Sequence, residues 1–474
     1  MVTVDVLPDD VLLTIFDFHA DHISSYAVDL SEFIDEDTKI ESWHSLVHVC
    51  RRWRGLVFAS PRRLNIQLCC TTRTPARETL DIWPPLPLVI QGDLSDSSVD
   101  NVIAKLKLSD RICKIELNCH TTLQIEKLMT AMRVPFPELT SLYVSFRGVS
   151  YDPVHPDLSL GGSAPRLKRL SLVAVPLSGL PKSLLPATHL VGLWLLHIPH
   201  SGYISPEAMV TCLSMLTSLD RLQLEFESPQ SCPDQENRRS PPPTRSVLPA
   251  LTFFWFKGVN EYLEELVARI DTPRLCQLSA TYFNDIDFDT PELIRFVSYT
   301  PKLGAYNEAR LIFDYREALV RLRSPPYFRM VQVKILCRVS DWQLSSLAQI
   351  CTLSLHFFLT MENLYIHENR YSPDNWTDDI ENSEWLDLLL PFTAVKNLYV
   401  SKQFTPHIAR ALQEPTGGRT TEVLPALQNV LLEGFQPSEP VHEGIRQFVS
   451  ARQLSSRPVA ISAWERDYEQ EDSY

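Results

Sequence analysis

The sequence predicts an α/β protein that begins with a small all-helical segment and continues as a long, irregular solenoid of strands and helices. Two observations point to this class. Apolar residues recur at helical spacing in two pieces of the first 63 residues, and a short apolar motif then repeats along most of the remaining chain. With 474 residues, of which 44% are hydrophobic, the chain can bury a large core.

The first helical piece covers residues 8–18. Its apolar residues Val11, Leu12, Ile15 and Phe16 are spaced as on one helix face. Pro8 suits the first turn of a helix, and the carboxylates of Asp9 and Asp10 suit its N-terminal dipole. We therefore expect an amphipathic helix here.

The second piece, residues 43–53, predicts another apolar-striped helix, and its pattern stops at Ser60-Pro61. The stripe consists of Trp43, Leu46, Val47, Cys50 and Trp53. Two or three helices of this size bury too little apolar area to be stable alone. We therefore expect the exposed stripe to dock on another protein or on the rest of the chain. An N-terminal cap on the following solenoid is therefore the alternative to an external partner.

The order of these residues resembles the F-box, the helical motif that links substrate receptors to the Skp-type adaptor of cullin-RING ubiquitin ligases. The resemblance covers about residues 5–60 and lies in Leu7-Pro8, Ile15-Phe16 and Val49-Cys50-Arg51-Arg52-Trp53. It implies that Leu7, Pro8, Leu12, Ile15 and Phe16 face the adaptor, and that Val49, Cys50 and Trp53 form the core or edge of the same surface.

The stretch at about 19–41 is longer than a compact F-box has, so we interpret it as an insertion in a helical domain of residues 1–63. Together with the segments 43–54, 60–64 and 76–84, it is similar to large families of F-box proteins from mushroom-forming fungi. Residues 1–41 hold eleven Asp or Glu and a single Lys. The following cluster, Arg51, Arg52, Arg54, Arg62 and Arg63, is interpreted as a solvated face, with pairing to an acidic adaptor or to the insertion as the alternative.

The rest of the chain repeats a unit of apolar, two residues, apolar, one residue, apolar. Its first positions are 112, 139, 167, 190, 219, 251, 275, 330, 361, 395 and 427, and the double gap after 275 holds a degraded copy at 311–313. Alternating apolar residues predict a strand, and helical patterns follow at 206–216 and 260–270. Such stacked units predict a leucine-rich-repeat-like solenoid over 64–464, with a generic α/β domain as the alternative.

Three segments are predicted to be loops or tails: about 228–247, about 367–384, and the acidic residues 465–474. The ten cysteines are scattered without a Cys-x-x-Cys pair, which favours reduced, buried thiols. No secretory signal or run of eighteen apolar residues is present, so we expect a cytoplasmic or nuclear protein that does not interact with membranes. The net charge of −14 argues against nonspecific nucleic-acid binding.

No residue pattern predicts catalysis. Phosphate-binding loops and the nucleophile elbow are absent from the sequence, and His44 and His48 lack the glutamate that the metalloprotease pattern requires. We therefore expect no catalytic residues, no metal and no cofactor.

The resemblance implies a non-catalytic substrate receptor that docks the Skp-type adaptor, and through it cullin, while the solenoid holds an unknown target protein. The alternatives are an interaction scaffold without a link to ubiquitination and an enzyme whose site is assembled across the solenoid. Strand positions that alternate with the buried leucines are the expected target contacts: Tyr143, Ser145, Arg169, Ser171, Trp194, Gln223, Glu225, Trp255 and Tyr399.

Overall fold

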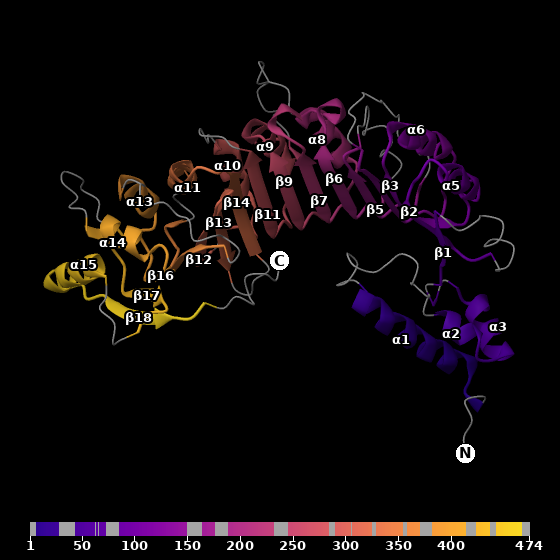
Figure 1. Ribbon diagram of the computed structural model, residues 1–474, viewed down its shortest axis with the longest axis horizontal. Coiled ribbons are helices and arrows are strands. Elements are labelled where there is room, and N and C mark those ends of the chain that lie inside the picture. Colours follow the sequence, from indigo (N-terminus) through magenta and orange to yellow (C-terminus); the bar gives the residue numbers. More distant parts are fainter. Residues whose placement is uncertain are drawn as a thin grey trace. The chain divides into compact units, whose positions relative to one another are not determined.

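The computed structural model describes residues 6–27, 43–61, 63–64, 66–72, 85–148, 164–175, 188–231, 245–283, 290–304, 306–324, 329–353, 358–369, 382–413, 423–436 and 442–466. The chain divides into two compact units, Met1–Ile204 and Ser205–Tyr474. Each unit contains parallel strands with helices between them (Figure 1). The predicted domain boundary at residue 63 stays a prediction, as do the insertion and loops where they fall on residues outside the described ranges.

The first unit begins with three helices: α1 (Asp9–Ala27), α2 (Trp43–Val47) and α3 (Arg51–Ala59). Helix α1 extends into the segment expected to be an insertion. The prediction of one continuous helix over 43–53 is wrong, because the helix is interrupted between Val47 and Arg51. Cys50 has extended backbone angles, and its Sγ accepts a hydrogen bond from the Trp53 N–H at 3.4 Å. Cys50 is therefore the N-cap of α3, not part of a helical stripe.

Six parallel strands follow in the first unit, paired in chain order: β1 (Leu68–Thr71), β2 (Leu88–Asp93), β3 (Ile112–Cys119), β4 (Ser141–Phe146), β5 (Arg169–Val173) and β6 (Gly192–Ile198). Helices α5 (Val99–Leu106) and α6 (Thr122–Ala131) cover one face of this sheet, and the short helix η3 (His200–Gly202) follows β6. The Thr121 side chain and Gln124 form a capping box at the start of α6.

The helices of the second unit are α8 (Pro206–Ser214), α9 (Asn260–Val267), α10 (Pro291–Tyr299), α11 (Ser340–Leu353), α13 (Asn382–Leu389), α14 (Thr405–Gln413) and α15 (Glu443–Leu454), with the short helix η4 (Pro229–Ser231). A small parallel pair is formed by β8 (Ser246–Val247) and β10 (Ile270–Asp271). Helices α8 and α9 confirm the two predicted helical halves. Figure 1 shows α8 to α11 along one face of the main sheet.

In the described residues of the second unit, the main sheet consists of β7 (Arg221–Phe226), β9 (Phe253–Gly258), β11 (Gln277–Phe283), β12 (Glu308–Asp314), β13 (Glu317–Ser324), β14 (Arg329–Leu336), β15 (Asn363–Glu368), β16 (Asn397–Val400), β17 (Asn429–Glu433) and β18 (Ala460–Trp464). Their spatial order is β7-β9-β11-β14-β13-β12-β15-β16-β17-β18. All eleven predicted repeat positions coincide with or shortly precede a strand. An α/β architecture with a mostly parallel, leucine-rich-repeat-like sheet is therefore confirmed.

The double gap after residue 275 contains two strands, not one degraded repeat. Strand β13 is antiparallel to both β12 and β14, whereas β14 is parallel to β11 and β12 is parallel to β15. The chain therefore advances to the position of β12 and returns by two hairpins to β14. We call these three strands the meander.

Candidate functional site

The three N-terminal helices pack around a small apolar core. The ring of Phe16 lies 4.7 Å from the ring of Trp53 at an interplanar angle of 58°. Phe16 and Leu12 are fully buried, and Val47 and Val57 are buried beside them. Two of the residues expected to face an adaptor, Leu12 and Phe16, are therefore core residues of this helical module.

Arginine side chains tie the same helices together. Arg52 of α3 donates to the Leu7 carbonyl at 2.6 Å and forms an ion pair with Asp9 at 2.6 Å. Arg54 donates to the Val47 carbonyl at 2.9 Å, which bridges the break between α2 and α3. At least part of the arginine cluster therefore holds the module together and positions the Leu7-Pro8 segment, in addition to facing solvent.

A second set of apolar side chains is exposed on this module. Val11, Ile15 and Phe18 follow one another at helical spacing on α1, with exposures of 39%, 48% and 73%. Val49 is 58% exposed, Pro8 is exposed, and Leu7, Cys50 and Trp53 are half-buried. We call Val11, Ile15 and Phe18 the α1 stripe. Of the predicted adaptor residues, Pro8, Ile15 and Val49 are thus exposed.

The strands present a second surface on the side opposite the packed leucines. We call it the open face and define it by the strand positions that alternate with those buried leucines. All nine strand residues expected to contact a target lie at such positions, but Ser145 and Glu225 are buried there and are not accessible contacts. In the first unit one row across neighbouring strands runs Gln91, Glu116, Tyr143, Ser171 and Trp194.

In the second unit the corresponding row runs Gln223, Trp255, Ser279, Gln332, Arg321, Arg310, Tyr365, Tyr399, Leu431 and Ser462. The row is uncharged from Gln223 to Gln332 and basic at Arg321 and Arg310. Beyond the meander it continues with the aromatic residues Tyr365 and Tyr399. Reading this row from the sequence requires the meander order, because Arg310 and Arg321 become neighbours only through the hairpin.

An arginine and three aromatic rings form a continuous stack on the open face. The Arg310 guanidinium lies 4.7 Å from the centre of the Tyr365 ring, and Tyr365 stacks on Tyr399 at 4.1 Å. The Trp464 ring meets Tyr399 edge-on at 5.6 Å. Burial, helped by the nearby Glu308 carboxylate, raises the pKa of the Tyr365 hydroxyl, so the Arg310 guanidinium lies over a neutral ring.

The chain then returns across the open face after its last strand. Arg466 donates to the Glu368 carbonyl at 2.6 Å and to the His367 Nδ1 at 2.7 Å, and it forms an ion pair with the Glu368 carboxylate at 3.2 Å. In the sheet, β15 is the third strand from β18, and Arg466 nevertheless reaches it. Residues 464–466 therefore cross part of the open face, and we call them the strap.

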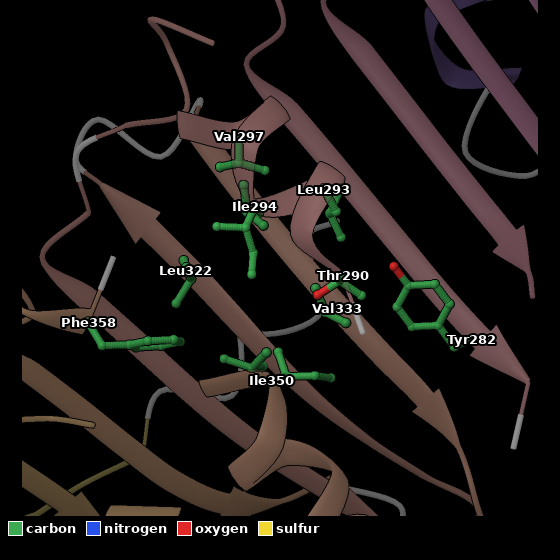
Figure 2. Close-up of a pocket in the computed structure, with 11 residues that line it drawn as sticks. Tyr282, Thr290, Leu293, Ile294, Val297, Leu322, Val333, Ile350 and Phe358 are labelled. Carbon is green, nitrogen blue, oxygen red and sulfur yellow. The ribbon is translucent and has the colours of Figure 1, made fainter. Parts of the chain in front are cut away.

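One apolar recess interrupts the helix side of the meander. It contains about 520 Å³ of empty space, part of which is open to solvent. Figure 2 shows residues that line it on α10, the meander and α11, namely Leu293, Ile294, Val297, Leu322, Val333 and Ile350, together with Phe358, which follows α11, Tyr282 of β11 and Thr290 before α10. Among the described residues, no carboxylate, imidazole or cationic side chain lines it.

In the described part of the chain, no three His, Cys, Asp or Glu side chains are grouped so that they could hold a metal ion. Likewise, none of the helices within the described ranges is long and apolar enough to span a membrane.

By topology the chain is an α/β repeat protein in which parallel strands are stacked side by side. No protein-family model and no curated protein matches it. Among solved structures it is similar to the leucine-rich repeat-containing protein LegL7 from Legionella pneumophila, with 14% sequence identity, coverage of 82% of this chain and 97% of that chain, and a TM-score of 0.28. The α/β repeat architecture follows from the strand register described above.

Proposed function

We propose that this chain is the substrate receptor of a Skp-cullin-F-box type ubiquitin ligase. In this proposal the helical module binds the Skp-type adaptor, and through it cullin, and the open face binds a target protein. The chain makes or breaks no bond itself. It accelerates ubiquitin transfer by raising the local concentration of target lysines near the conjugating enzyme.

The observation that carries the proposal is the α1 stripe next to Leu7-Pro8. Exposed apolar side chains at helical spacing on a three-helix module are suited to docking a partner. The same segment carries the F-box resemblance. In the proposed interface the contacts come from Pro8, the α1 stripe and Val49, whereas Leu12 and Phe16 support them from inside the module.

A pull-down with the Skp-type adaptor of the same organism tests the proposal. We compare the unaltered chain with a Leu7→Ala, Pro8→Ala, Ile15→Asp variant. Placing a carboxylate in an apolar contact should cost at least about 2 kcal/mol, or about thirtyfold in Kd. The matched control is Leu454→Asp, because Leu454 is an apolar residue that is 88% exposed on α15.

Retention of adaptor by the chain and by Leu454→Asp, and its loss by the folded triple variant, would support the proposal. If the unaltered chain does not retain adaptor at micromolar concentration, the ubiquitin-ligase function is wrong. Cullin capture and turnover of a bound target separate the receptor from a scaffold that binds adaptor without ubiquitination.

A further inference from the structure

One arginine fastens the strap to the open face. The Arg466 side chain is 2% exposed, and it contacts both His367 and Glu368 at the end of β15. The Glu368 carboxylate also accepts a hydrogen bond from the Ser401 hydroxyl, which follows β16. We call the contacts of Arg466 with His367 and Glu368 the latch.

The imidazole of His367 is buried although its strand position belongs to the open face. His367 alternates along β15 with Leu364 and Ile366, which are packed on the helix side. Its exposure is nevertheless 1%, and the centres of the His367 and Trp464 rings are 6.4 Å apart. The strap therefore covers an imidazole that lies on the recognition side of the sheet.

The latch requires a neutral imidazole. A guanidinium only donates hydrogen bonds, so the His367 Nδ1, 2.7 Å from Arg466, has to accept and carries no proton. An imidazolium has a proton on both nitrogens and would place a second cation against Arg466. Its Nδ1–H could donate only to the Glu368 carbonyl, 3.0 Å away, where Arg466 already donates. Protonation of His367 therefore breaks the latch.

The surroundings of the imidazole do not supply a new partner for that proton. In the described part of the chain, its neighbour on β12 is Ile312, and Ser401 lies beside it toward β16, both of them uncharged. The Glu368 carboxylate is already bonded to Arg466 and Ser401. Other charged groups around this site are engaged elsewhere or exposed: Arg310 with Glu308, Asp314 with the Arg316 N–H, Glu433 with the Lys402 N–H, and Glu465 in solvent.

We propose that the latch is a pH-sensitive switch, which holds the strap on the open face while His367 is neutral and releases it when His367 is protonated. Release takes the Trp464 ring away from Tyr399 and Tyr365, which it contacts at 5.6 and 5.8 Å. It thereby uncovers aromatic surface on the open face. In the proposed function this surface adds to the target site under mildly acidic conditions. That use rests on the proposed function, but the switch does not.

The direction of the switch follows from proton binding. A histidine in contact with solvent titrates near pH 6.5, whereas the closed latch excludes the proton. Opening of the latch therefore takes up one proton below about pH 6.5, and each further pH unit favours opening by up to about tenfold. The latch is at full strength above that pH. Between pH 7.5 and pH 5.5 the opening equilibrium should rise about tenfold.

Hydrogen exchange of the full chain, read by peptide mass spectrometry at pH 7.5 and pH 5.5, measures this opening. The rates are corrected for the pH dependence of intrinsic exchange. Strand β18 is the last strand of the described sheet, and the strap continues directly from it, so its amides report on the latch. Their protection should be about tenfold lower at pH 5.5, whereas protection in β9 and β11 should not change.

Three substitutions separate the latch from a general effect of acid. His367→Asn keeps an acceptor oxygen near the position of Nδ1 but does not titrate, so protection of β18 should be equal at the two pH values. Arg466→Gln removes the guanidinium and should give low protection at both. The matched control is His120→Asn, because His120 is an exposed histidine of the first unit, and it should keep the tenfold change.

The proposal is overturned if β18 of the unaltered chain loses no protection at pH 5.5. It is also overturned if His367→Asn shows the same loss as the unaltered chain, or if Arg466→Gln retains the pH dependence. Arg466→Gln leaves His367 in place, so it decides the question even if His367→Asn does not fold. Adaptor capture does not involve the latch, and its failure would count only against the proposed function.

Discussion

The ring of Phe16 in α1 packs against the ring of Trp53 in α3 at 4.7 Å, although the two residues are 37 positions apart in the chain. This contact places Phe16 inside the helical module and leaves its neighbour Ile15 outside. Adjacent residues of one apolar pattern therefore have different surroundings, one buried in the module and one exposed.

Replacing Phe16 by alanine should unfold the module locally. The loss of a fully buried phenylalanine costs about 3–5 kcal/mol, which a three-helix module cannot offset. Hydrogen exchange measured by mass spectrometry should show faster exchange in α1 and α3. Ile15→Ala is the matched control, because this side chain is 48% exposed. Equal protection in the two variants would contradict the packing described.

Three asparagines on neighbouring strands form a ladder that predicts a graded loss of stability. Asn397 donates to the Asn363 side chain at 2.8 Å and accepts from the Asn429 side chain at 2.7 Å. Asn397→Ala removes both hydrogen bonds and should cost about 2 kcal/mol, whereas Asn429→Ala removes one and should cost about 1 kcal/mol. Urea denaturation measures the difference. Equal losses would contradict the prediction that Asn397 contributes twice as many hydrogen bonds of the ladder as Asn429.

Much of the strand architecture could be predicted from the sequence, because each repeat places two apolar residues on one face of a strand. The pattern identifies which face of a strand is buried but not the direction in which the strand runs. It therefore does not predict that β13 is antiparallel to its neighbours. A two-residue gap at Tyr315-Arg316 between two alternating runs was the available signal for a hairpin. The break at Cys50 was also missed, since apolar spacing continues across it. The Arg466 contact joins residues 98 positions apart, and no local pattern encodes it.

Buried cysteines should remain unreactive in the folded protein. Burial raises the pKa of Cys119 and of Cys212 to about 12. In the unfolded chain a thiol ionises near pH 8.5, so the folded state retains these protons over a range in which the unfolded state loses them. The stability that these thiols contribute is therefore complete below about pH 8.5 and is lost as the pH rises toward 12.

Iodoacetamide labelling at pH 8.5, read by peptide mass spectrometry, tests this prediction. Cys119 and Cys212 should be alkylated only after guanidinium is added, whereas Cys69, which is half-buried, should react faster in the folded chain. Rapid labelling of Cys119 without denaturant would contradict its burial.

A carboxylate on one helix caps the next helix. Glu264 of α9 accepts hydrogen bonds from the N–H groups of Glu292 and Leu293 at 2.8 and 2.9 Å, at the start of α10. Glu264→Gln keeps one acceptor oxygen and loses the negative charge at a helix N-terminus, which should cost about 1–2 kcal/mol. Glu261→Gln on the exposed side of α9 should change the thermal midpoint little. Equal shifts for the two variants would rule out the capping role.

The meander has a consequence for how the second unit folds. Its strands are joined by a two-residue loop at 315–316 and a four-residue connection at 325–328, whereas the parallel neighbours are joined only through longer crossovers. Short loops lose less entropy on closure and form faster. We therefore expect β12, β13 and β14 to pair first, leaving an edge at β14 for β11 and an edge at β12 for β15. Folding would then spread from the middle of the unit toward both ends, unlike an array built only from crossovers.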